Sequence, residues 1–579
     1  MEEVIKSECE IIENPRSSIE SNSDDPPNKR QKQVTDVQES TVEIVEQSSV
    51  ANEENQNIRS SIEDTIEIKL TRKEELDFSL VHMLVTDLES FEYVERKGFR
   101  DFVKKLDSSY EIPSTIHLKY KLFPDLYNVL KLKLQSVLME VKFVTLSADT
   151  WSKSSCECYY ISITCHFIWN NRLSAAVLET KQIEELSSSK LFTAIKEVID
   201  NWNLENKVVC IVTDNNTSFH EAVKKLGLSH ITSFVHSLQL VANDCFELPS
   251  IDNLIQKCKN IVHWFSSEAR FKDKIEQNPT LQETLHLISS VTSNWINVYY
   301  ILKCIMYLKD NLEELSEDMP STFTPGELST IEGCFFCLDC IRVAISDTDH
   351  NQYSMHSLII PTMSFVHEKL RLVENVKMKT ALCELFLDRM KNSIHSKLKF
   401  YETADIPLMS SILDPRIKKH GFRLPLIAVK AENLLLQESS SAIEQVKTKV
   451  ENSYQTTPIK SEDDDACNLL NFLGAHINQI YKRRTKASTI TIELESYLAD
   501  PIIEITSNPM DYWKENQMVF PNLYTLACKY LSIPAHSVPT ERIFSDVIKK
   551  QSQKIENEDG CVDKFVFFRQ NKWLKNVVI

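Results

Sequence analysis

Two aspartates, each at the end of an apolar run of strand length, are the residues best placed to do chemistry. Asp149 ends the run 142–149, and Asp214 follows Thr213 at the end of the run 208–212. Carboxylates at strand ends can bind Mg²⁺ or Mn²⁺, which prefer oxygen ligands and activate a nucleophile in phosphoryl transfer. The same position also suits a turn-forming residue or a helix N-cap, so the spacing leaves both interpretations open.

Glycine scarcity excludes several classes of enzyme. The chain has 7 glycines among 579 residues, and no two lie closer than Gly326 and Gly333. Phosphate-binding loops and nucleophile elbows need closely spaced glycines. The sequence therefore disfavours Rossmann dehydrogenases, P-loop ATPases, protein kinases and α/β-hydrolases.

The cysteines predict reduced thiols. There are 15, an odd number scattered along the chain, which is untypical of a disulfide framework. Cys334, Cys337 and Cys340 have the spacing of a zinc motif but lie in an apolar helical run, so buried thiols are favoured over a zinc site. No structural zinc is expected.

The order of the predicted helices and strands indicates where Asp149 and Asp214 lie in the fold. Helical spacing at 74–140 precedes β-rich runs at 142–149, 159–169 and 174–183, and a helix at 189–202 leads to the strand 208–212. A strand, a crossover helix and a parallel strand form one unit, which makes the first and fourth strands expected sheet neighbours. Ligands of open α/β sheets bind at the carboxyl edge, where Asp149 and Asp214 would lie.

The rest of the chain is predicted to be helical or disordered. Residues 1–65 contain no aromatic residue and 6 Lys and Arg against 16 Asp and Glu, which indicates a disordered acidic tail within a chain of net charge −18. Its cluster 26–32 suits a nuclear localisation signal or plain solvated charge. Helical spacing fills about 240–500, with a polar surface loop expected at 437–465. No run is long enough to span a membrane, so we expect a cytosolic or nuclear protein.

The final segment resembles the C-terminal dimerisation region of hAT-superfamily transposases. The landmarks occur in a fixed order at 508–513, 520–524, 526–527, 530–534 and 537–545. Further motifs that resemble the same superfamily lie at 110–113, 149–152, 212–215 and 413–416. The resemblance covers about 75–579 and is closest to zinc finger BED domain-containing proteins derived from hAT transposons.

This resemblance implies a fold and a triad. The fold is α/β plus α: a ribonuclease H-like mixed sheet interrupted by a large all-helical insertion. The expected domains are a disordered tail (1–65), a helical domain (66–140), the first part of the core (141–240), the insertion (241–500) and a dimerisation region that completes the core (501–579).

The implied catalytic and metal-binding residues are Asp149, Asp214 and Glu541, with Mg²⁺ or Mn²⁺ if the protein is catalytic. Ser537 and Pro539 suit the start of a helix, which would place Glu541 near its positive end. An ordinary acid at a helix N-terminus is the alternative interpretation of Glu541.

The sequence departs from the family at two DNA-binding candidates and in its N-terminal part. The family's Cys-x-x-His keeps His236, but Ser233 replaces the Cys, and the family's Arg-Trp-Asn pattern keeps only Trp295. The family's Trp stacks on DNA, although core packing is an equal alternative for Trp295, and a structural role is an alternative for His236. Residues 1–140 contain one cysteine, Cys9, so no BED finger is expected there.

The expected function is that of a nuclear hAT transposase-derived protein that homodimerises through 501–579 and associates with DNA, in a domesticated or finger-less form. One alternative is an active DDE transposase that cleaves and transfers DNA strands. A second alternative is a protein–protein scaffold without DNA contact, which the net charge favours. No membrane partner is expected.

Overall fold

The computed structural model describes most of the chain from residue 71 onward. The described ranges are 71–152, 159–268, 271–290, 294–309, 319–350, 356–375, 380–453, 490–537 and 562–576. All of them belong to one compact unit, Lys69–Ile579. The predicted disordered tail with its basic cluster lies outside the described residues. None of the described helices combines the length and the hydrophobicity needed to span a bilayer.

Helices precede the sheet, as the apolar spacing predicts. Their bounds are α3 Arg72–Asp87, η2 Phe91–Glu95, α4 Lys97–Leu106, α5 Thr115–His117, η3 Leu118–Leu122 and α6 Phe123–Glu140. Helix α3 begins with a capping box, in which Thr71 and Glu74 each accept a hydrogen bond from the other's backbone N–H. One face of α3 carries Val81, Leu84 and Val85, which are buried in a core that also contains side chains of the sheet.

Five strands form one mixed sheet in the described part of the chain, in the order β3-β2-β1-β4-β5. Their bounds are β1 Val144–Ser152, β2 Tyr159–Trp169, β3 Arg172–Ile183, β4 Val208–Thr213 and β5 His230–Thr232. β1 is antiparallel to β2 and parallel to β4, and β4 is parallel to β5. The prediction that the first and fourth strands are neighbours is therefore confirmed.

The β2–β3 hairpin shows how local sequence sets the topology. Its two connecting residues, Asn170 and Asn171, have φ angles of 49° and 58°. A two-residue hairpin turn with both φ angles positive matches the right-handed twist of the strands, and asparagine tolerates this conformation. The turn therefore sends β3 back along the outer side of β2.

The two faces of the sheet pack against different helices. Leu146 of β1 and Ile211 of β4 point into a core formed with α3, α6, α7 (Ser188–Asn201) and α8 (Thr217–Leu226). Cys210 and Val212 point the other way, into the core of α9 (Phe234–Asp244) and the helices that follow it. The sheet is thus covered on both faces, as parallel pairing requires.

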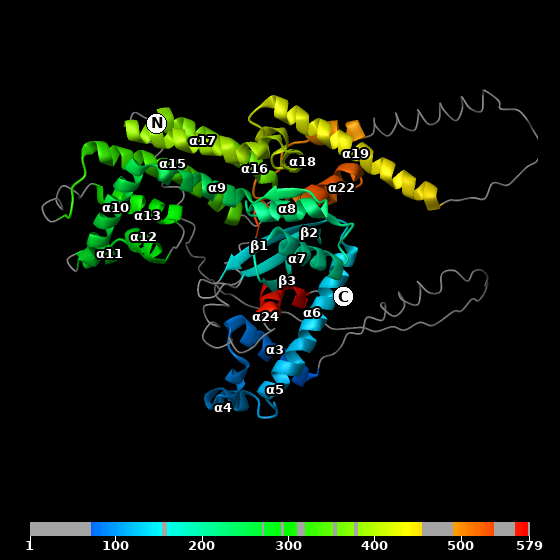
Figure 1. Cartoon of the computed structure of the whole chain (residues 1–579). Helices are drawn as coiled ribbons and strands as arrows, with labels where there is room; N and C mark the ends of the chain where they lie inside the picture. The colour runs from blue at the N-terminus through cyan, green and yellow to red at the C-terminus, as the bar shows by residue number, and fades with distance from the viewer. Residues whose placement is uncertain are drawn as a thin grey trace, which may run out of the picture. The chain divides into compact units, whose positions relative to one another are not determined.

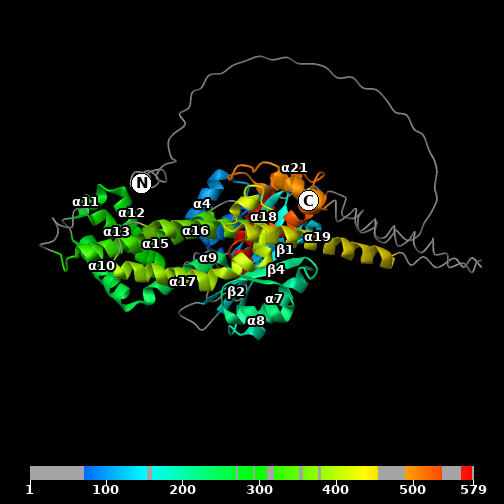
Figure 2. The same cartoon turned by 90° about the horizontal axis from the view of Figure 1, so that it is seen from above.

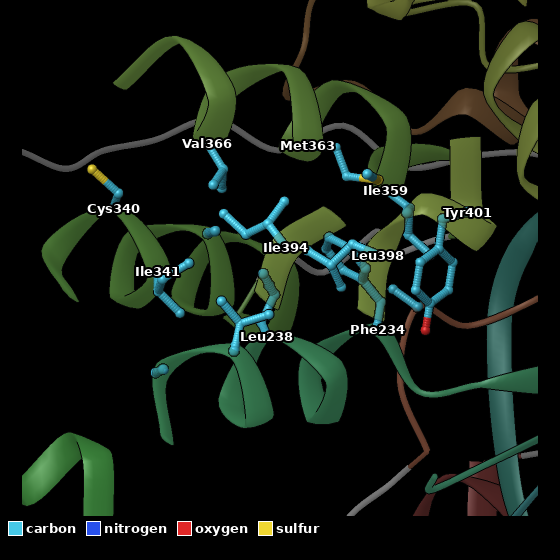
Figure 3. Packing of buried hydrophobic residues seen from close by; sticks show 14 of the residues in the cluster. Phe234, Leu238, Cys340, Ile341, Ile359, Met363, Val366, Ile394, Leu398 and Tyr401 are labelled. Carbon is cyan, nitrogen blue, oxygen red and sulfur yellow. The ribbon is translucent and has the colours of Figure 1, made fainter. Parts of the chain in front are cut away.

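A helical region occupies the chain between α9 and residue 453. Its bounds are η4 Cys245–Glu247, α10 Pro249–Ser267, α11 Lys272–Glu276, α12 Pro279–Ser290, α13 Asn294–Leu308, α15 Pro325–His350, η7 His356–Leu358, α16 Ile359–Asn375, α17 Ala381–Thr403, α18 Asp405–Ile412, η8 Lys418–Gly421 and α19 Pro425–Ser453. Helices α15, α16 and α17 lie side by side in Figures 1 and 2. Figure 3 shows Leu238 of α9, Ile341 of α15, Met363 of α16 and Ile394 of α17 in their shared core.

Helix α19 corrects one expectation of the sequence. A surface loop was expected from Gln437, but α19 continues to Ser453. The serines of this stretch are poor helix formers, yet the helix is packed against the protein where they begin. Ser439 is buried and donates to the Leu435 carbonyl of the same helix, and the neighbouring Glu438 pairs with Lys529 of the C-terminal region. The remainder of the expected loop, 454–465, lies outside the described residues.

The C-terminal region packs into the body of the protein. Its elements are α21 Pro509–Glu515, α22 Pro521–Tyr530, α24 Val562–Gln570 and η9 Lys572–Asn576. Trp513 is fully buried, and its indole N–H donates to the Leu413 carbonyl over 2.9 Å. The buried Glu493 carboxylate accepts from the backbone N–H groups of Asn522 and Leu523, where the start of α22 favours a negative charge.

A buried ion pair joins the helical region to the C-terminal region. The side chains of Asp414 and Arg416 are fully buried and lie 2.7 Å apart. Ser357 donates a further hydrogen bond to Asp414, and Arg416 donates to the Ile505 carbonyl. Because a desolvated pair is stable only when its remaining donors and acceptors are satisfied, this cluster specifies how three segments meet. The motif noted at 413–416 therefore has a structural role here.

The last described segment covers part of the outer edge of the sheet. The buried side chain of Asn571 accepts from the Val177 N–H over 3.0 Å and donates to the Val177 carbonyl over 2.8 Å. At this residue of β3 it takes the place of a neighbouring strand. Figure 1 shows α24 below the sheet, where it contacts β3, α3 and α6.

Candidate functional site

The ends of β1 and β4 bring Asp149 and Asp214 to one edge of the sheet. Ser147 of β1 lies opposite Val212 of β4 in the parallel ladder. Continued by two residues along each chain, this register would place Asp149 and Asp214, the latter just beyond the end of β4, at matching positions on the same face. Both residues are partly exposed. The carboxyl edge of the sheet therefore carries two neighbouring carboxylates.

A one-residue shift in register decides this placement. The pairing of β1 with β4 shifts between Val144 and Leu146, because β4 contains one residue more than β1 over that stretch. Without the extra residue Asp149 would match Thr213, and Asp214 would point to the opposite face. Irregularities of this kind re-aim side chains near functional sites.

Asp214 also shapes the turn that follows β4. Its Oδ1 accepts a hydrogen bond from the Asn216 N–H over 3.0 Å, and Asn216 in turn caps α8 by accepting from the Ser218 N–H. The turn-forming interpretation of Asp214 is therefore confirmed. This role is compatible with metal binding, because a carboxylate has two oxygens with several acceptor sites.

A hydroxyl network ties the Asp214 turn to the helical region. The Tyr401 hydroxyl of α17 donates to the Thr232 carbonyl over 2.8 Å and lies 3.2 Å from Ser237 Oγ. Asn215, next to Asp214, donates to the same Ser237 Oγ over 3.3 Å. Burial raises the pKa of Tyr401 to about 12, so its hydroxyl remains a donor at neutral pH. Tyr401 thus connects this turn to α17, and no local sequence pattern marks it.

Small polar side chains line the face of β1 and β2 that carries Asp149, and we call them the polar face. Facing residues in the antiparallel ladder are Thr145 and His166, Ser147 and Thr164, and Asp149 and Ser162. All but Asp149 are buried. Ser147 Oγ lies 2.8 Å from His166 Nε2. Burial, followed by the nearby charge of His536, lowers the pKa of His166 to about 3, so its imidazole is neutral.

The C-terminal chain passes beside this edge. The backbone N–H of His356 donates to the Ile533 carbonyl over 2.9 Å, and its Nδ1 lies 3.2 Å from the Pro534 carbonyl. The next residue, Ala535, accepts from the N–H of Phe234, which begins α9 two residues after the end of β5. Residues 533–535 are therefore fixed next to the carboxyl end of the sheet.

Glu541 lies outside the described residues, which end at Ser537 on this side. Its role stays a prediction. Glu541 lies six positions after Ala535 (541 minus 535), and such a length of chain reaches at most roughly 20 Å. The anchored start of this segment is thus compatible with a glutamate that approaches the aspartates.

The donor set suits a hard cation. Two carboxylates on one face offer the oxygen ligands that Mg²⁺ and Mn²⁺ prefer. Within the described ranges, no group of three or more His, Cys, Asp or Glu side chains is arranged to hold a metal ion. A complete triad would therefore need a further ligand, for which the resemblance to hAT transposases predicts Glu541.

The two DNA-binding candidates lie in different surroundings. His236 is half-buried in the first turn of α9, where its backbone N–H donates to the capping Ser233. Trp295 of α13 is only 3% exposed and packs in the helical core. The core-packing alternative therefore describes Trp295 here, because a buried ring cannot stack on a base without leaving the core.

The cysteines of the CxxC spacing are buried in α15. Cys334, Cys337 and Cys340 all contribute to the helical core. Burial raises the pKa of each thiol, and that of Cys340 to about 12. Thiols with raised pKa are poor nucleophiles and poor metal ligands at neutral pH. This agrees with the interpretation of these residues as buried helix thiols.

Two family models match the parts of the chain that build this site. Residues 147–239 match the ZBED1 RNase-like domain, and residues 493–571 match the hAT family C-terminal dimerisation region. The first match includes Asp149, Asp214 and His236. The second includes α21, α22 and α24.

Similar proteins carry zinc finger BED names. The chain is 22% identical to mouse zinc finger BED domain-containing protein 6, over 91% of this chain and 58% of that protein. It is 20% identical to human zinc finger BED domain-containing protein 4, over 80% of this chain and 41% of that protein. The rice protein RICESLEEPER 3 is 20% identical, over 81% of this chain and 65% of that protein. The chain thus spans about half the length of the first two relatives.

The buried imidazole of the polar face predicts a pH dependence of stability. Unfolded histidine binds a proton below about pH 6.5, whereas the pKa of folded His166 is about 3, so acid favours the unfolded state. Between about pH 7 and about pH 5, this difference should lower the free energy of unfolding by about 2 kcal/mol. Chemical denaturation at both pH values should show this loss in wild type and its absence in His166→Asn.

His263, which is exposed on α10, supplies the matched control. His263→Asn should keep the wild-type pH dependence. An equal loss of stability in wild type and His166→Asn would contradict the assignment of a neutral buried imidazole.

Proposed function

We propose that this hAT-derived protein, a relative of the zinc finger BED domain-containing proteins, is a nuclear protein that forms homodimers through its C-terminal region and associates with DNA. The match of residues 493–571 to the hAT dimerisation region carries the proposal. In this proposal the chain is domesticated: it keeps the transposase fold as a scaffold for a dimer on DNA.

Exposed apolar side chains in the matched region support the dimer. Ile502, Ile505, Met518 and Val519 are 52%, 61%, 86% and 62% exposed. Adjacent large apolar side chains that are exposed, as Met518 and Val519 are, are typical of protein interfaces. They lie outside the packed interior of the C-terminal region, so they are free to meet a second copy.

A local excess of positive charge supports contact with DNA. Residues 96–121 contain 7 Lys and Arg against 3 Asp and Glu, a balance of +4 within a chain of net charge −18. Lys97, Lys104 and Lys105 of α4 are exposed. Phosphate contacts from such side chains supply most of the non-specific affinity for DNA.

The shared face of Asp149 and Asp214 favours a second candidate function, that of an active DDE transposase. Two carboxylates at one edge fit Mg²⁺ or Mn²⁺, which would supply Lewis-acid activation in DNA strand cleavage and transfer when bound. Asp149 and Asp214 would hold the ions with Glu541. The turn bonded to Asp214 and the network through Tyr401 would keep the carboxylates in place.

The dimer proposal predicts a monomeric variant. Met518→Glu with Val519→Glu should weaken self-association by about tenfold or more, because an interface would have to bury uncompensated carboxylates. Sedimentation velocity of the full chain measures this. Circular dichroism should be unchanged, since both side chains are exposed in the folded chain.

Met139 of α6, which is 69% exposed and lies outside the matched region, supplies the control. Met139→Glu should dimerise like wild type. A double variant that dimerises normally, or a wild type that is monomeric, would reject the C-terminal interface.

The DNA proposal predicts salt-dependent binding of a labelled duplex, measured by fluorescence anisotropy. Replacement of Lys104 and Lys105 by Ala should lower the slope of log affinity against log salt by about two, since each lysine displaces roughly one counterion. Absence of binding at low salt would contradict DNA association and favour the scaffold alternative.

The variant Asp214→Asn separates the two candidate functions. It should leave DNA binding intact, and it should abolish Mg²⁺-dependent nicking if the transposase is active.

A further inference from the structure

Two histidines face each other beside the strand that leads to Asp214. His220 lies on α8, and His230 is the first residue of β5. Their Nδ1 atoms are 3.3 Å apart, with the ring planes inclined by 61°. His220 is exposed and His230 is half-buried, so the pair opens to solvent on one side.

One tautomer of His230 satisfies all of the contacts around it. Thr213 Oγ1 lies 2.9 Å from the Asp214 carbonyl, which can only accept, and 2.8 Å from His230 Nε2. When the hydroxyl donates to the carbonyl, it accepts from His230 Nε2. In this arrangement His230 carries its proton on Nε2, and its Nδ1 presents a lone pair towards His220. Burial lowers the pKa of His230 to about 4, so the ring stays neutral at neutral pH.

The separation of the two nitrogens matches that of two ligands on one ion. Zinc binds histidine nitrogens at about 2.0–2.1 Å, and a tetrahedral angle then places two such nitrogens roughly 3.3 Å apart. His220 can present its own Nδ1 lone pair when its proton moves to the exposed Nε2. The Nδ1 lone pairs of both rings could then bind the same ion, and the net charge of the protein would not change.

We propose that His220 and His230 chelate a divalent transition-metal ion of the Zn²⁺ class through their Nδ1 atoms. Imidazole nitrogens suit Zn²⁺, Ni²⁺ and Cu²⁺, whereas the carboxylates of Asp149 and Asp214 suit Mg²⁺ and Mn²⁺. Among the described residues no third His, Cys, Asp or Glu completes the set, so water fills the other positions. The site is separate from the acidic edge and does not depend on the proposed function.

The bond from His230 to Thr213 has the form of an outer-shell contact. Metal-bound histidines usually donate their other N–H to a neighbouring acceptor, which fixes the orientation of the ring. Here that acceptor is Thr213, whose hydroxyl is bonded to the backbone of Asp214. A bound ion would link α8 to β5 and hold the end of β4 in place. We therefore expect the ion to stabilise the folded protein.

Zinc titration of the full chain tests the proposal. Calorimetry should give one Zn²⁺ site that His220→Ala weakens by about tenfold or more. Zinc should raise the melting temperature of wild type but not of the variant. His263→Ala removes an exposed helical histidine elsewhere and should behave like wild type in both measurements.

Two further results decide the identity of the ligands. A Co²⁺ complex should lack the near-ultraviolet charge-transfer band of thiolate ligation, and Asp149→Asn should bind zinc as tightly as wild type. Unchanged affinity in His220→Ala would overturn the proposal. A thiolate band that persists in His220→Ala would place the ion on cysteines, and loss of zinc in Asp149→Asn would place it at the acidic edge. Either result would overturn the proposal.

Discussion

The parallel pairing of β1 with β4 is the constraint on which the candidate site depends. Side chains alternate between the two faces of a strand, so two aspartates at neighbouring strand ends meet only when the register is right. The extra residue in β4 supplies that register, and Asp149 and Asp214 then share one face. The remaining elements fix this arrangement: α8 and α9 hold the ends of β4 and β5, and Tyr401 connects them to the helical region.

The C-terminal region packs into the body of the protein, and it is also the part that matches the hAT family dimerisation region. Trp513, the Asp414–Arg416 pair and Asn571 bury it against three different parts of the chain. The same region exposes Met518 and Val519. A segment that completes the core and also presents apolar side chains outward can couple dimerisation to the integrity of the sheet.

Much of the fold could be predicted from local pattern, because apolar periodicity marks strands and helices where they occur. Four of the five described strands and most helices follow from it, and the crossover rule makes β1 and β4 neighbours. The short strand β5 was not predicted. The register shift could not be predicted, since one extra residue in β4 leaves the apolar pattern unchanged. The polar face and Tyr401 depend on partners that are distant in sequence, and the burial of Trp295 depends on how the helices pack. Helix α19 continues where Ser439 is buried and Glu438 pairs with Lys529, so tertiary packing overrides weak helix propensity.

Iron-directed cleavage tests the shared acidic edge most directly. Fe²⁺ that replaces Mg²⁺ generates hydroxyl radicals, which cut the backbone next to the metal ligands. With the full chain, ascorbate and peroxide, mass spectrometry should find cuts beside both Asp149 and Asp214, with a third near Glu541. Excess Mg²⁺ or Asp214→Asn should suppress all of them together. Cleavage near only one aspartate, or cleavage that Asp214→Asn leaves unchanged, would contradict a single metal-binding edge.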